Sequence, residues 1–178
     1  IGEVARILDI SESASQQHLH RARTRVTAER HRGGEADPAS ARRVVEEFLA
    51  AATSGRTERL VALLTDDVTA VSDGAGLSTR ILRYRTRERV ASLVQGGFKP
   101  TQAKRRLAGG TLAMHIAWVN GSPAVVAVVD EKVVGVVAFE VSEGRVSSVH
   151  GIAAAARLSR VNEFWHRYEP DAPVISAW

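Results

Sequence analysis

The sequence predicts an α+β protein, a helix-turn-helix fragment followed by a domain whose helices pack on one face of a curved, mainly antiparallel sheet. Two observations predict this class. Before Leu112 the apolar residues recur mainly at the helical spacings of three and four, and from Leu112 onward the spacing changes to two. Helices followed by a run of strands favour an α+β arrangement over an alternating one.

The composition is that of a globular and mildly basic chain. Hydrophobic residues make up 44% and charged residues 25% of the 178 residues, and the formal net charge is +4. The absence of cysteine excludes disulfides, thiolate metal sites and cysteine nucleophiles. No apolar run approaches the roughly 20 residues of a membrane span. No signal-peptide pattern opens the chain, although a fragment could not show one. A cytoplasmic setting without membrane contact is the default expectation.

The stretch 1–26 has the form of a helix-turn-helix. An apolar stripe on the first helix ends in a turn, and Ser11 is placed to cap the second helix with Glu12 in its first turn. One face of that second helix holds Ser15, Leu19, Ala22 and Val26. The opposite face carries side chains that suit base edges and phosphates in a major groove, namely Gln16, Gln17, His18, Arg21, Arg23 and Arg25.

These six residues, together with Ser11 and Ser13, are the predicted DNA-binding residues of the chain. A cluster of arginines near the start of the chain fits an anionic partner, since Glu29 is the one acid between Gln16 and Arg32. On spacing alone, two amphipathic helices with a solvated basic face explain the stretch equally well.

Two helices are predicted next. Asp37 followed by Pro38 supplies a cap and a first-turn proline, and Gly55 ends the helix that they begin. Thr57 is predicted to cap a second, shorter helix, which the Asp66-Asp67 pair ends. The core-facing residues of the two helices are Val44, Val45, Phe48, Leu49, Ala52, Leu60, Leu63 and Leu64.

A strand pair and a third helix follow. Weak alternation predicts a strand at Val68–Ser72, and Leu77–Tyr84 is predicted to be its partner. Thr86 is predicted to cap a helix that ends at Gly96-Gly97 and turns Val90, Leu93 and Val94 inward. The segment Lys99–Arg106 fits either a strand or a loop.

A meander of long strands is predicted after Leu112, with turns at Asn120-Gly121, Asp130-Glu131 and Glu143-Gly144. Leu112, Met114, Ile116 and Trp118 should share one face of the first strand. The apolar strand Ala124–Val129 should be buried on both faces. The remaining strands are Val133–Val141 and Val146–Ile152.

A last helix is predicted at Arg157–Tyr168, with Leu158, Val161 and Trp165 on one side, and the tail from Pro170 is predicted to be irregular. The predicted parts are therefore the helix-turn-helix at 1–32, a linker at 33–38, the α+β domain at 39–168 and the tail at 169–178.

The first 26 residues resemble the promoter −35-binding helix-turn-helix at the end of region four of bacterial sigma factors, the extracytoplasmic-function group most closely. The resemblance rests on Glu3-Val4-Ala5, Leu8, Ser11, Leu19 and Arg21-Ala22-Arg23. Ser15 departs from the pattern, since the family usually has an apolar residue there. Because Ile1 opens inside the motif, the chain is expected to be a C-terminal fragment of a longer protein.

The order of elements over 39–152 resembles the SnoaL-like, nuclear-transport-factor-like cone fold. Sigma factors of the SigJ type place such a domain directly after region four. The two resemblances together imply core RNA polymerase and promoter DNA as partners, and a regulatory role for the cone domain without a cofactor. The cone can also hold a small apolar ligand.

Two short motifs of the SigJ type have counterparts here. Asp73-Gly74-Ala75-Gly76-Leu77 stands where the family has Asp-Gly-Gly-Gly-Lys, and Ala154–Leu158 stands where it has Asn-Pro-Asp-Lys-Leu. The resemblance assigns regulatory roles to Asp73, Gly74, Gly76, Leu77, Arg157 and Leu158. Both motifs follow strand ends, so we expect them to lie near each other. The first motif can also be read as an ordinary glycine turn.

The main alternative is a SnoaL-like enzyme or small-ligand-binding protein with a helical appendage. Related cyclases and isomerases use buried acids, histidines or tyrosines for proton transfer. The candidates here are Asp73, Tyr84, His115 and His150. His115 shares its strand face with Ala113 and Ala117, and His150 should share its face with Val146 and Ile152. A lone histidine on a strand is more often structural than catalytic. No Ser-His-Asp set, phosphate loop or metal-ligand spacing is present, so no catalytic role, cofactor or metal is expected.

Overall fold

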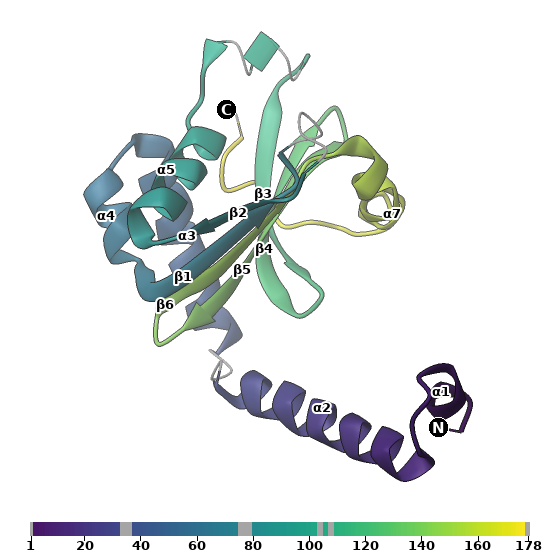
Figure 1. The fold of residues 1–178 in the computed structure, drawn as a ribbon. Coiled ribbons are helices and arrows are strands. Elements are labelled where there is room, and N and C mark those ends of the chain that lie inside the picture. The colour runs from purple at the N-terminus through teal and green to yellow at the C-terminus, as the bar shows by residue number, and fades with distance from the viewer. Residues whose placement is uncertain (1, 33–36, 75–79, 103–104, 107–108, 177–178) are drawn as a thin grey trace. The chain divides into compact units, whose positions relative to one another are not determined.

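The structure is a computed structural model that describes residues 2–32, 37–74, 80–102, 105–106 and 109–176 (Figure 1). The chain divides into two compact units, unit 1 at Ile1–Glu35 and unit 2 at Ala36–Trp178. Unit 1 is helical, and unit 2 combines helices with a six-stranded sheet. The predicted α+β class is therefore confirmed.

Unit 1 consists of α1 (Gly2–Ile7) and α2 (Glu12–Arg32). The predicted cap is present, because the backbone N–H of Ala14 donates to Ser11 Oγ at 3.1 Å. Among residues 2–25 of unit 1, Ala5 and Ser15 are the buried ones, at 3% and 7% exposure. The small serine thus occupies the inward position where the resemblance leads to an apolar residue.

The first helix of unit 2, α3 (Pro38–Ser54), has the predicted ends. Asp37 Oδ2 accepts the backbone N–H of Ser40 at 3.1 Å, and Gly55 ends the helix in the left-handed region with φ of 75°. In α4 (Thr57–Ala62) the predicted cap is wrong. Thr57 is the first helical residue, and its hydroxyl instead accepts a hydrogen bond from Gln95 Nε2 at 2.9 Å.

The first strand pair differs in length from the prediction. The strand β1 (Leu64–Ser72) begins directly after α4, so the Asp66-Asp67 pair lies inside the strand and does not break the helix. The pair can be exposed there because the register with its neighbour shifts between Leu64 and Thr69. Its partner β2 is shorter than predicted, at Leu82–Arg85, and residues 75–79 lie outside the described part.

The helix α5 (Arg87–Phe98) also corrects the prediction. Thr86 stands at the cap position with φ of 74°, but its side chain makes no capping hydrogen bond. The helix continues through Gly96-Gly97 because Phe98, at 7% exposure, is packed in the core and holds the last turn. The following segment is neither strand nor plain loop, since three described residues there are helical: Gln102, Arg105 and Arg106.

The predicted meander is present as β3 (Leu112–Val119), β4 (Ser122–Val129), β5 (Lys132–Ser142) and β6 (Arg145–Ile152). Each connecting turn has two residues with positive φ, the combination that two-residue hairpins require. The sheet order is β2-β1-β6-β5-β4-β3, and all neighbours are antiparallel except the parallel pair of β1 and β6.

Helices cover both faces of the sheet, so the prediction of one covered face is wrong (Figure 1). On the inner face, under α3, α4 and α5, Phe48 and Phe139 meet edge to face with ring centroids 5.3 Å apart. On the outer face, α7 buries Leu158 among residues of β3, β4 and β5. This helix spans Ala155–Trp165, so it begins and ends earlier than the predicted Arg157–Tyr168.

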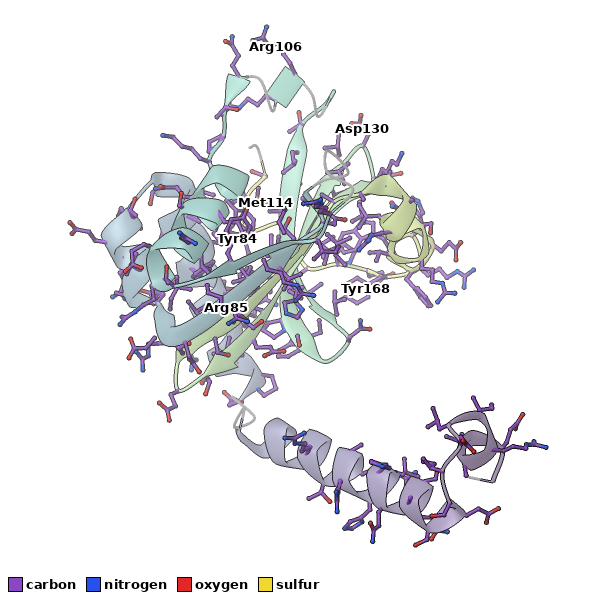
Figure 2. The ribbon with its side chains drawn as sticks, in the orientation of Figure 1. Tyr84, Arg85, Arg106, Met114, Asp130 and Tyr168 are labelled. Carbon is purple, nitrogen blue, oxygen red and sulfur yellow. The ribbon has the colours of Figure 1, made fainter. Side chains whose placement is uncertain are left out.

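The two ends of β3 hold further differences. Leu112, Met114 and Ile116 are buried in the core of the inner face. Trp118, predicted to share their face, is 44% exposed near the end of β3, next to the hairpin turn. The tail is not wholly irregular, since Ile175 forms an antiparallel bridge with Met114 (labelled in Figure 2). In the described part of the chain, no helix has the length and apolar character needed to span a membrane.

Candidate functional site

The predicted DNA-binding residues are all exposed: Ser11 at the cap position, Ser13 in the first turn of α2, and the six amide and basic residues up to Arg25. Exposure does not separate the two predicted faces, however. Leu19, predicted to face inward, is 39% exposed, and Ala22 is exposed as well. Only Ser15 among the described inward positions is buried, so the roles of these residues stay predictions.

The helix α2 aligns amide and guanidinium groups that suit contacts to bases and phosphates. Gln17, Arg21 and Arg25 follow one another at intervals of four residues and therefore form one stripe along α2. A glutamine amide can pair with an adenine edge, and an arginine can pair with a guanine edge or a phosphate. The capped start at Ser11 fixes where this stripe begins.

The second candidate site lies around Asp73, where β1 ends. Its side chain is 6% exposed, and its two carboxylate oxygens accept the backbone N–H groups of Ala153 and Ala154, each at 3.0 Å. The backbone N–H of Asp73 donates to Gly151 O at 3.2 Å. Charge-assisted bonds of this kind are about twice as strong as neutral ones. They tie the end of β1 to the segment that leads from β6 into α7.

The expectation that the two motifs lie near each other is therefore confirmed for the described residues. Gly74 has φ of 63°, which favours glycine, and its N–H donates to Ser72 Oγ at 3.1 Å. Gly76 and Leu77 lie outside the described part. Arg157 is exposed on the first turn of α7, whereas Leu158, at 2% exposure, belongs to the packed core of the outer face.

A surface groove of about 550 Å³ lies beside the second motif, between α7 and the turn that joins β4 to β5. Ala153, Ala155 and Leu158 line one part of it, and Asn162 lines another. Asn162 fastens α7 to β5, because its Oδ1 accepts the backbone N–H of Val133 at 2.8 Å and its Nδ2 donates to Val133 O at 3.1 Å. Asn162 had no sequence signal, because a side chain that bonds to backbone groups leaves no residue pattern.

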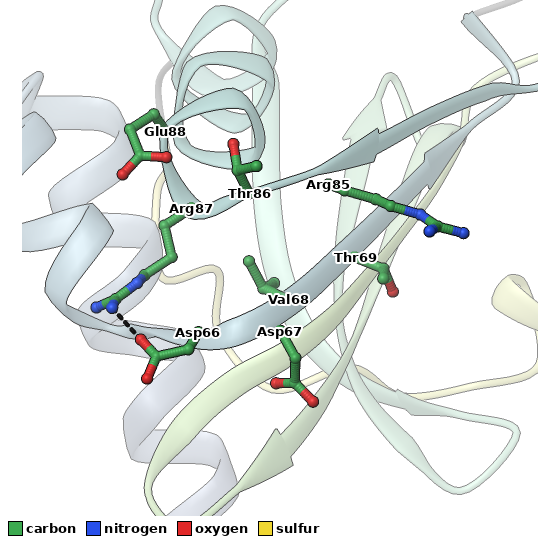
Figure 3. Close-up of a pocket in the computed structure, with 8 residues that line it drawn as sticks. All are labelled: Asp66, Asp67, Val68, Thr69, Arg85, Thr86, Arg87 and Glu88. Carbon is green, nitrogen blue, oxygen red and sulfur yellow. Dashed lines mark hydrogen bonds and ion pairs between the residues drawn. The ribbon is translucent and has the colours of Figure 1, made fainter.

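A second groove of about 440 Å³ lies between the start of α5 and the strands β1 and β2 (Figure 3). Figure 3 shows Arg87 pointing toward Asp66, with which it forms an ion pair, while Arg85 points away from that pair. Asp67 and Glu88 add negative charge to the same groove. Its charges are thus mixed, and exposed pairs of this kind contribute little to stability.

The proposed proton-transfer residues are not brought together. Tyr84 packs against the core of the inner face (Figure 2), whereas His115 lies on the outer face with its ring edge to face against Trp165. His115 Nδ1 lies 2.9 Å from the backbone oxygen of Asp171. Because a carbonyl oxygen can only accept, a hydrogen bond here requires the tautomer with its N–H at Nδ1. Asp73 holds backbone amides at the end of β1.

The predicted face of His150 is partly wrong. Val146 is buried with Val149 under the helices of the inner face, because the register between β5 and β6 shifts between Glu140 and Val141. His150 is exposed, and its Nε2 lies 3.0 Å from Ser148 Oγ. Among the described residues, no group of three or more histidines, cysteines, aspartates or glutamates could hold a metal ion.

The three inner helices contribute fully buried side chains to the interior of unit 2. Val45, Phe48, Leu60 and Val90 of the three inner helices each have no exposed surface. A small apolar ligand inside the cone therefore stays a prediction.

Comparison with known proteins gives one informative similarity. No family model and no curated protein matches the chain. Among solved structures, the chain is similar to the Mycobacterium tuberculosis extracytoplasmic function sigma factor SigJ, with 26% identity, 88% of this chain and 54% of that chain covered, and a TM-score of 0.56. The chain thus spans about half the length of that sigma factor.

Two further solved structures are similar to the chain over a smaller share of its length. A SnoaL-like protein of Burkholderia thailandensis is 16% identical, with 65% of this chain and 96% of that chain covered and a TM-score of 0.45. An NTF2-like protein of Cytophaga hutchinsonii is 12% identical, with 66% and 93% covered and a TM-score of 0.44.

The Asp73 contact generates a first prediction. Asp73→Asn should leave one side-chain oxygen for the backbone N–H groups of both Ala153 and Ala154, so that one of them loses its acceptor. The free energy of unfolding should fall by about 1–3 kcal/mol. Chemical denaturation measures this loss, and amide exchange at Ala153 and Ala154 should become faster. Asp67→Asn, at an exposed position in β1, the strand that leads to Asp73, is the matched control. Equal stability of both variants and the wild type would contradict the assigned role of the carboxylate.

Proposed function

We propose that this chain is the C-terminal part of an extracytoplasmic-function sigma factor. In this proposal unit 1 contacts the promoter −35 element and core RNA polymerase, and unit 2 regulates that activity. The observation that carries the proposal is the extent of the similarity to SigJ. A match over 88% of 178 residues is longer than unit 2 alone, so it includes residues of both units in one chain.

The geometry of unit 1 supports the DNA-binding part. A short helix, a turn at Asp9 with φ of 51° and a Ser11-capped second helix form the arrangement that docks in a major groove. The stripe of Gln17, Arg21 and Arg25 is exposed and lies early in α2. Recognition helices contact base edges with their N-terminal residues.

The contact around Asp73 supports the regulatory part. A fused domain can bias a sigma factor only if it binds the factor's states unequally. The two motifs that the SigJ resemblance marks meet at one place, where Asp73 holds Ala153 and Ala154. Arg157 is exposed beside that place and offers a charged contact to a neighbouring surface. The glycine-rich composition of 33–38 suits a linker that permits reorientation while keeping the units close.

A regulatory rather than catalytic role for unit 2 is part of the proposal. The support is the separation of Tyr84 from His115 and His150 on opposite faces of the sheet, which leaves no acid–base pair between them. A SnoaL-like enzyme or ligand-binding protein is the alternative that the next experiments must exclude.

The DNA-binding assignment is tested by Arg21→Ala and Gln17→Ala in the full-length protein. Each change should weaken promoter-specific transcription with core RNA polymerase, by about 1–3 kcal/mol per lost base contact. Arg160→Ala, which removes an exposed arginine of α7, is the control and should transcribe like the wild type. Unchanged promoter binding by both α2 variants would remove the basis of the assignment.

The regulatory assignment is tested by Asp73→Asn and Arg157→Ala, with Arg160→Ala again as the control on the same helix. At least one of the two changes should shift transcription up or down at a temperature where circular dichroism shows a folded protein. If both folded variants transcribe like the wild type, the two motifs have no regulatory role.

The enzyme alternative is tested by His115→Gln and His150→Gln. Both variants should transcribe near the wild-type level, because neither side chain belongs to α2 or to the two motifs. The same proteins are assayed for turnover of ketosteroid- and polyketide-type substrates. Turnover by the wild type that either change abolishes would favour the enzyme and count against a purely regulatory unit 2.

A further inference from the structure

After α7 the chain turns back and lies along the free edge of the sheet. β3 is the edge strand at the opposite end of the sheet from β2, and Figure 1 shows the yellow end of the chain running from α7 past β3. The backbone N–H of Met114 donates to Ile175 O at 2.8 Å, and that of Val174 donates to Met114 O at 2.8 Å. Within residues 171–175, called here the tail segment, Val174 and Ile175 therefore form an antiparallel bridge with Met114 of β3.

The start of the tail segment is recognised at two atoms of Asp171. Its carboxylate Oδ2 accepts a hydrogen bond from Arg42 Nη1 of α3 at 2.7 Å. Its backbone oxygen lies 2.9 Å from His115 Nδ1 of β3. Arg42 is itself positioned by Glu46, whose Oε1 accepts from Arg42 Nε at 3.0 Å. Hydrogen bonds to Asp171 and then to Glu46 raise the pKa of Arg42, so its guanidinium stays charged.

The end of the tail segment is recognised by packing. Ile175 is half-buried against the core of the inner face, next to the buried Met114. The residues between are exposed, Val174 at 39%. The contacts are thus specific for an aspartate and, four residues later, a β-branched aliphatic side chain. The remaining contacts are main-chain hydrogen bonds, which do not depend on the side chain.

The tail segment is held by few groups. Among the described residues, its contacts are an exposed ion pair, the approach of His115 to the backbone oxygen of Asp171, one half-buried side chain and main-chain bonds to a single residue of β3. Segments with so little buried contact open at a lower free energy than the core does. Strand addition to a sheet edge is also a common way in which folded domains bind extended peptides.

We propose that the β3 edge, together with Arg42 and His115, is a peptide-docking site that the tail segment occupies as an exchangeable ligand. The ligand class is an extended peptide with an aspartate four residues before a β-branched aliphatic residue. The proposal is independent of the sigma-factor assignment, because it rests on contacts within unit 2.

The test uses the full chain with Asp171→Ala and Ile175→Ser together, and a fluorescent peptide of residues 169–176. The double variant should bind the peptide at least about tenfold more tightly than the wild-type chain, whose tethered segment competes at a high effective concentration. Adding Arg42→Ala to the double variant should weaken binding several-fold. Arg43→Ala is the matched control, since its Nη2 donates to Ser40 Oγ on the exposed side of α3.

Absence of saturable binding to a folded double variant would overturn the proposal, as would equal binding of a peptide with alanine at the Asp171 position. If the double variant does not fold, amide exchange in the wild-type chain decides. The amides of Met114, Val174 and Ile175 should exchange at least about tenfold faster than those of Val125 and Val126. If all five amides exchange at one slow rate, the tail segment is an integral part of the fold and the docking site is refuted.

Discussion

Burial of β4 on both faces is the constraint from which the arrangement of unit 2 follows. Val125 and Val129 pack under the inner helices, while Val126 and Val128 pack on the opposite side. A strand that is apolar on both sides needs cover on both, so α7 must return over the outer face. The Asp73 carboxylate anchors the segment that begins this return. The exposed part of the second motif is thereby placed at the foot of α7, beside the end of β1.

Spacing and turn chemistry were enough to predict the helix α3 and the four strands of the meander. Their signals are local, such as the Asp37 cap and the paired turn residues that adopt positive φ. Predictions of faces failed where a register shift intervenes, as at Val146 and His150, because one extra residue inverts the alternation. Capping predictions failed at Thr57, where the hydroxyl has a partner 38 residues away.

The candidate sites were predictable to different degrees. The meeting of the two motifs was predicted from their positions after strand ends. It occurs because β1 and β6 are parallel neighbours, so both strands end on the same side of the sheet. The groups that Asp73 binds could not be predicted from the sequence, since they are the backbone amides of Ala153 and Ala154, which any residue carries. The pairing of the tail with β3 was missed for a related reason, because one bridge at Met114 leaves no periodicity in the sequence.

In the proposed function, unit 1 binds promoter DNA with core RNA polymerase, and unit 2 regulates the activity of that complex. Amide hydrogen exchange of the full-length protein, free and bound to core RNA polymerase with promoter DNA, tests both halves at once. The account predicts slower exchange along residues 12–25 of α2 and altered exchange at residues 153–158 in the complex. Identical exchange at both places in the free and bound protein would contradict it.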